Sequence, residues 1–139
     1  MKLETFSYFS RDGWSVTDLP ALDSPQTLVV AFGPPAFYAT PQIIRDLATF
    51  YPQSKLIGCS TAGEIYGTSL SDNSLSVAIA QFENTSLALA TAPVTQANES
   101  FAAGVSIGQQ LFQPSLRGVL VLSDGLSVNG SDLVEGLNS

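Results

Sequence analysis

Apolar positions along the chain fall into short runs that end in turn-forming residues. The run from Thr27 to Phe32 is apolar on both faces and stops at Gly33-Pro34-Pro35, a pattern typical of a buried strand in a parallel sheet. A second run, Lys55 to Cys59, has the same character, and between the two runs apolar residues recur at helical spacing from Pro41 to Pro52, with Thr40 as the expected cap. The sequence therefore predicts a βαβ unit. Because such units are right-handed, the loops that follow the two strands are expected at the same edge of the sheet.

The second half of the chain predicts further strands and helices. Residues 74–82 and 86–92 alternate in part between polar and apolar positions on either side of a short link, which predicts a β-hairpin. An amphipathic pattern predicts a helix that starts at Asn98 or Ser100 and ends before Pro114. Residues 117–123 repeat the buried-strand pattern, and residues 131–137 have the pattern of a capped helix.

These elements define the expected fold class. It is an α/β domain whose mixed sheet contains βαβ units and a β-hairpin, with helices packed on the sheet. We expect residues 1–26 to form an irregular N-terminal lead and residues 27–139 to form the domain itself. Because the last helix has hardly begun where the sequence stops, we expect the domain to be incomplete at its C-terminus.

Composition and charge limit the classes of function. Only 12% of the 139 residues are charged and 45% are hydrophobic, which predicts one compact domain with a buried core. The formal net charge of −7 disfavours nucleic acid as a partner. No apolar run approaches the roughly 18 residues that span a bilayer, so we expect no membrane insertion. A single cysteine and an N-terminus without an apolar signal segment indicate a reducing, cytoplasmic setting.

The stretch from Ile57 to Glu64 holds the strongest candidate chemistry. An apolar strand ends there in glycines and hydroxyls, which leaves backbone N–H groups and side-chain hydroxyls free to face a ligand. Catalysis has less support, because the chain has no histidine to act as a base and the run Gly58 to Ala62 departs from the nucleophile elbow at its last position. With one cysteine and no calcium-loop or phosphate-loop spacing, we expect no metal site and no cofactor.

Three runs, in this order and at this spacing, carry a family resemblance. They are Leu28 to Phe32, Leu56 to Ile65 and Val119 to Gly125. Together they resemble the N-terminal FIST domain (F-box and intracellular signal transduction proteins), and Gly58 to Glu64 corresponds to that family's signature loop. The resemblance implies a sensory module of bacterial signalling proteins that binds a small ligand, with amino acids as candidates. It also implies two partners outside this chain, a C-terminal FIST companion domain and a signalling output domain.

The predicted site lies at the carboxyl edge of the sheet. If the strand at Val119 neighbours the first two, three loops meet where open α/β sheets bind ligands. Backbone N–H groups and the hydroxyls of Ser60 and Thr61 would then receive a carboxylate, while Glu64 or Asp124 would pair with an amino group. Alternatively, Asp124 caps a turn and Glu64 is a solvated charge. The candidate ligand-binding residues are Gly33, Tyr38, Cys59, Ser60, Thr61, Ala62, Gly63, Glu64, Ser123, Asp124 and Gly125.

We therefore expect a non-catalytic domain that senses a small molecule. Two alternatives stay open. In the first, the chain is a fragment of a hydrolase-like enzyme, with Ser60 or Cys59 as nucleophile and its base outside this chain. In the second, the chain is a protein-interaction module in which the apolar helix from Asn98 docks a partner.

Overall fold

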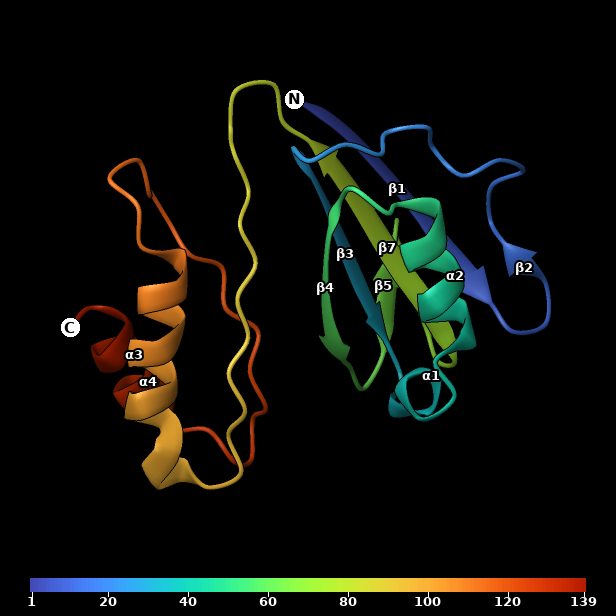
Figure 1. Ribbon diagram of the computed structural model, residues 1–139. Helices are drawn as coiled ribbons and strands as arrows, with labels where there is room; N and C mark the ends of the chain where they lie inside the picture. The colour runs from blue at the N-terminus through green and yellow to red at the C-terminus, as the bar shows by residue number, and fades with distance from the viewer. The chain divides into compact units, whose positions relative to one another are not determined.

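The computed structural model describes residues 1–139, which divide into two compact units, Met1–Leu87 and Ala88–Ser139. The first unit contains a mixed five-stranded sheet in the order β2-β1-β7-β3-β4 and a separate two-stranded sheet, β5-β6 (Figure 1). Its strands are β1 (Lys2–Phe9), β2 (Gly13–Trp14), β3 (Thr27–Gly33), β4 (Lys55–Ser60), β5 (Glu64–Tyr66), β6 (Ser69–Ser71) and β7 (Ser74–Gln81), and its helices are α1 (Pro35–Ala39) and α2 (Gln42–Phe50). The predicted α/β class is confirmed.

The βαβ unit is present as predicted. Strands β3 and β4 run parallel, with Gly33 opposite Ser60 at their carboxyl ends, and α1 and α2 connect them. The predicted cap of α2 is wrong. The Thr40 hydroxyl donates to the carbonyl oxygen of Ala36 at 2.9 Å, so it closes the end of α1, a short helix that the sequence pattern did not indicate. Pro41 precedes α2 instead, and no side chain caps it.

The predicted hairpin of residues 74–82 with 86–92 is wrong. Strand β7 pairs antiparallel with β1 on one side and with β3 on the other, so both of its edges are occupied and residues 86–92 form no strand. The consecutive strands that do pair antiparallel in this unit are β1 with β2 and β5 with β6. Strand β1 was also not predicted. It lies within the segment expected to be an irregular lead, and it supplies a full strand of the sheet.

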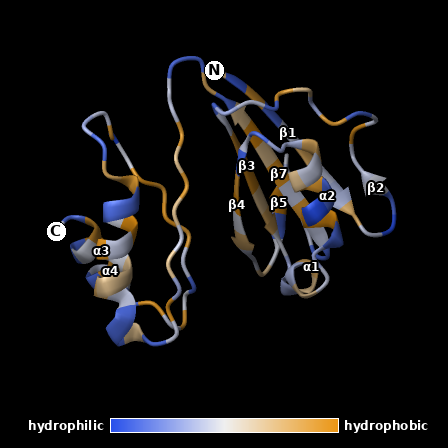
Figure 2. Ribbon diagram, in the orientation of Figure 1, coloured by the Kyte–Doolittle hydropathy of each residue, from blue (hydrophilic) through white to orange (hydrophobic).

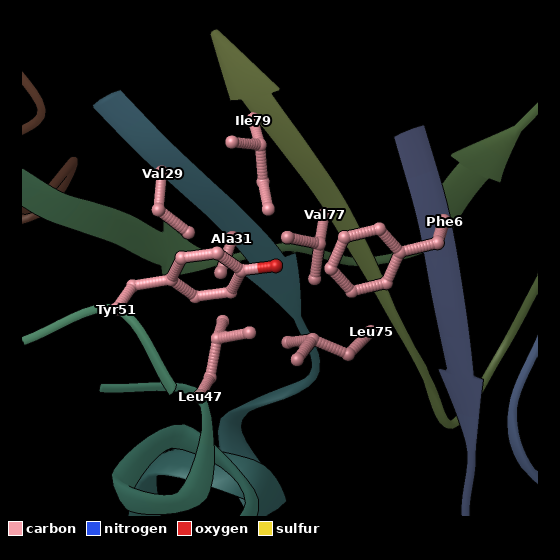
Figure 3. Packing of buried hydrophobic residues seen from close by; sticks show 8 residues of the cluster. All are labelled: Phe6, Val29, Ala31, Leu47, Tyr51, Leu75, Val77 and Ile79. Carbon is pink, nitrogen blue, oxygen red and sulfur yellow. The ribbon is translucent and has the colours of Figure 1, made fainter. Parts of the chain in front are cut away.

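The core of the first unit lies between one face of the sheet and α2. The inward residues come from β1, β3, β7 and the helix segment, and Figure 3 shows them pointing toward one another: Phe6, Val29, Ala31, Leu47, Tyr51, Leu75, Val77 and Ile79. Alternate residues of β3 are buried here because successive side chains of a strand point to opposite faces. The strands carry most of the hydrophobic colour of Figure 2 in this unit. The Tyr51 hydroxyl donates a hydrogen bond to the carbonyl oxygen of Pro20 at 2.8 Å. Burial, and next the nearby Asp23, raise the pKa of Tyr51 to about 12.

The second unit is built on two helices, α3 (Ser100–Leu111) and α4 (Gly130–Leu137), with a 3-10 turn, η1 (Ala97–Glu99), before α3. Both predicted helices are confirmed. The cap of α4 is Asn129, whose side-chain oxygen accepts the N–H groups of Ser131 and Asp132 at 3.1 and 3.4 Å. None of the helices in either unit combines the length and the apolar composition needed to cross a bilayer.

The predicted strand over 117–123 is absent. A strand needs a neighbour to complete its ladder of hydrogen bonds, and no other segment of the second unit is a strand. The side chain of Leu120 is 65% exposed as a result. An apolar run alone is therefore not sufficient for a strand, and residues 117–123 form none.

Candidate functional site

The carboxyl ends of β3 and β4 meet at one edge of the sheet. Gly33 ends β3 opposite Ser60, and the N–H group of Thr61 donates to the carbonyl oxygen of Gly33 at 3.0 Å. This bond ties the first residue after β4 to the last residue of β3. The predicted meeting of the two loops is confirmed, and it follows from the parallel pairing of the strands.

Gly33 allows close packing behind this edge. A Cβ at this position would lie 2.9 Å from Cδ1 of Leu75, 3.1 Å from the Phe37 ring and 3.1 Å from the carbonyl oxygen of Ser74. Any larger residue would have to displace a neighbour, since these distances are below ordinary van der Waals contact. The glycine therefore lets α1, β3 and β7 come together directly beneath the loop that follows β4.

Glu64 is the buried polar centre of the edge, with only 2% of its surface exposed. Its Oε1 accepts the Thr61 hydroxyl at 2.8 Å, and its Oε2 accepts the Ser74 hydroxyl at 3.3 Å and the Ser74 N–H at 3.4 Å. The alternative in which Glu64 is a solvated charge is wrong. A carboxyl group is buried only where donors replace its water, and here a hydroxyl of the loop and two groups of β7 do so.

Tyr38 covers the β3–β4 pair close to this edge. Its hydroxyl donates to the carbonyl oxygen of Ala31 at 3.3 Å, and a Cβ added to Gly58 would lie 3.2 Å from the same hydroxyl. Burial, together with the neighbouring Cys59 thiol, raises the pKa of the Tyr38 phenol. The phenol is therefore a neutral hydrogen-bonding group at physiological pH.

The solvent-facing part of the edge is small. Ser60 and Ala62 are exposed, whereas Cys59 and Thr61 are half-buried. Gly63 is half-buried against β6, since a Cβ there would lie 3.1 Å from Cδ1 of Leu70. A ligand approaching from solvent would therefore meet the Ser60 hydroxyl, the Ala62 backbone and the outer side of Thr61.

The remaining candidates, Ser123, Asp124 and Gly125, belong to the second unit and are all exposed. The Asp124 carboxylate accepts the N–H groups of Leu126 at 2.8 Å and Ser127 at 2.6 Å. These bonds, that to Ser127 foremost, lower the pKa of Asp124. The turn-capping alternative for Asp124 is thus what the structure shows within this unit.

Comparison with protein families identifies the domain. The model of the FIST N domain matches residues 27–139, which is most of the chain. The chain belongs to the FIST N domain family. Comparison with curated protein sequences gives no match, and comparison with solved structures gives none either. Membership of this family indicates a sensory domain of signal transduction.

Sequence reasoning missed Ser74 of this FIST domain. The residue lies ten positions beyond Glu64 and begins β7. The β5–β6 hairpin between them pairs Glu64 with Ser71, and so returns the chain to the point where Ser74 meets the Glu64 carboxyl group. A serine at the start of an expected hairpin strand carries no local signal of that contact. The contact therefore follows from the β5–β6 hairpin, which the sequence pattern did not predict.

The polar groups at this edge of the FIST domain are hydroxyl, carboxyl and backbone groups. The chain has no histidine, and Glu64 bonds to Thr61 and Ser74 rather than to either candidate nucleophile, Ser60 or Cys59. No group of three or more His, Cys, Asp or Glu side chains has an arrangement able to hold a metal ion. The residues present can offer hydrogen bonds to a small polar molecule.

Proposed function

We propose that this FIST N domain is the non-catalytic input module of a cytoplasmic bacterial signalling protein, and that it senses a small polar molecule, with amino acids among the candidates. The observation that carries the proposal is the junction of Gly33 with Ser60 and Thr61 at the carboxyl edge of parallel strands. Open α/β sheets bind ligands at such edges, because loops rather than helices surround the ends of the strands there.

The hydrogen bonds at this edge support a preorganised binding loop. The Thr61 backbone is fixed by Gly33 and its side chain by Glu64, which is itself fixed by Ser74. A loop that is already ordered loses less conformational entropy when a ligand binds, so a few polar contacts give measurable affinity. In this proposal the signal passes to a C-terminal FIST companion domain and an output domain.

The proposal is tested by ligand-dependent thermal stability. Binding to the folded state alone raises the melting temperature. The full-length protein and this chain would be melted with each common amino acid and with short carboxylates at millimolar concentration. A rise for one class of compound, lost in Thr61→Val, would support sensing at this edge.

A matched control separates a local effect from a general one. Thr68 lies in the exposed turn between β5 and β6, outside the proposed site. Thr68→Val makes the same chemical change as Thr61→Val and should leave the ligand-induced rise intact. If no compound raises the melting temperature of the full-length protein, the proposal for this ligand class is wrong.

A further inference from the structure

Thr61 has no hydrogen-bond donor left for a ligand. A threonine has two donors, its backbone N–H and its single hydroxyl proton. The N–H donates to the carbonyl oxygen of Gly33 at 3.0 Å, and the hydroxyl donates to Oε1 of Glu64 at 2.8 Å. The hydrogen-bonding capacity that stays free on Thr61 is that of an acceptor, through the lone pairs of its hydroxyl and carbonyl oxygens.

Glu64 keeps the hydroxyl proton in this orientation. The carboxyl group is 2% exposed, so water does not replace a hydrogen bond that Thr61 withdraws. Its other oxygen is already occupied by the hydroxyl and the N–H of Ser74, at 3.3 and 3.4 Å. Turning the Thr61 proton outward would leave Oε1 of Glu64 buried without a donor, which is unfavourable.

We infer that the ligand presents a hydrogen-bond donor to Thr61, in particular a protonated amine, and that this point of the edge does not receive a carboxylate. The inference rests on the proposed function and specifies the chemical class that the same site recognises. Charge favours the same class. All three hydrogen bonds to Glu64 come from uncharged donors, so no positive charge accompanies this side chain in them. A ligand ammonium group would supply that charge, whereas a ligand carboxylate would be repelled by the Glu64 carboxylate. The formal net charge of −7 acts in the same direction.

Two four-carbon probes of opposite charge test the inference. Butylammonium and butyrate share their apolar tail and differ in the charged group. The amide signals of Ser60, Thr61 and Ala62 in the full chain would be followed by NMR as each probe is added, with butanol as the uncharged control. Butylammonium should shift these signals with half-saturation at a concentration about tenfold lower than butyrate, the factor expected when one charged hydrogen bond forms and the other does not.

Glu64→Gln should reverse the preference. The Ser74 N–H can only donate, so it fixes the amide oxygen of the new side chain on its own side, and the amide NH2 group then donates to the Thr61 oxygen. The Thr61 hydroxyl proton is released toward solvent and can be donated to a carboxylate. Thr61→Ser keeps the hydroxyl and should keep the preference of the unaltered chain for butylammonium, so it controls for disturbance of the loop.

The outcomes separate this inference from the proposed function. If butyrate binds the unaltered chain as well as butylammonium or better, the inference is overturned while sensing at this edge stands. If neither probe gives a saturable shift at residues 60–62, and no compound raises the melting temperature of the full-length protein, both fail together. Should Glu64→Gln not fold, the comparison in the unaltered chain and in Thr61→Ser still decides the question.

Discussion

Helices α3 and α4 cross in close backbone contact at two glycines, so a methyl group added there should destabilise the second unit. A Cβ added at Gly104 would lie 2.2 Å from the carbonyl oxygen of Leu133, and one added at Gly136 would lie 2.1 Å from that of Phe101. Both contacts are with backbone, which has no rotamer to escape into. Gly104→Ala therefore forces the two helices apart by about 0.8 Å to reach the 3.0 Å below which such contacts do not occur.

The expected magnitude is the difference between two effects. Overpacking costs about 1–3 kcal/mol, and that cost includes the dispersion energy lost where the helices are forced apart. Alanine regains about 1 kcal/mol through its higher helix propensity. Because the contact is with backbone, we take the upper end of the overpacking range and expect Gly104→Ala to destabilise the unit by about 2 kcal/mol.

Gly108 provides the matched control in the same helix. A Cβ there would lie 3.2 Å from the carbonyl oxygen of Leu137, a distance that a small shift can relieve. The gain in helix propensity should offset that strain, so Gly108→Ala should stay within about 0.5 kcal/mol of the unaltered chain. Urea unfolding followed by circular dichroism measures both changes, and hydrogen exchange locates the loss of protection in α3 and α4. Equal stability of the two variants would refute the close helix crossing.

Three further predictions concern the first unit and the turn at Asp124. Ser7→Ala should raise the stability to urea by about 1 kcal/mol, because the buried Ser7 hydroxyl has no hydrogen-bond partner and its removal ends an uncompensated burial; a loss of stability would contradict this. Since the folded pKa of Tyr51, about 12, lies above its ordinary value of 10.0, the contribution of Tyr51 to stability should be constant below pH 10 and be lost as pH rises from 10 toward 12. Tyr51→Phe should abolish that part of the pH dependence in urea titrations. The lowered pKa of Asp124 means that its turn is favoured above the ordinary value of 3.8 and is lost as pH falls through the folded value. Carboxyl NMR titration in water and in urea should show the lower pKa only in the folded chain.

The local pattern of the sequence determined the βαβ unit and the helices α2, α3 and α4. The apolar run of β3, the helical spacing before Pro52 and the second run of β4 fix strand, helix and strand, and handedness then places the two loops together. The small residues after β4 are also visible in the sequence, so the edge of the sheet could be predicted as a candidate site. These features depend on neighbours along the chain or on one short connection.

Tertiary structure decided which strands pair and which side chains meet. The pattern of β7 fits a hairpin strand as well as the central strand that it is, because pairing partners far apart in sequence leave no local mark. The apolar run at 117–123 illustrates the converse, since hydrophobicity without a neighbouring strand gives no ladder. The environment of Glu64 depends on the unpredicted β5–β6 hairpin. That hairpin pairs Glu64 with Ser71 and brings Ser74 to it, and the contact turns an apparent surface charge into the buried group that orients Thr61.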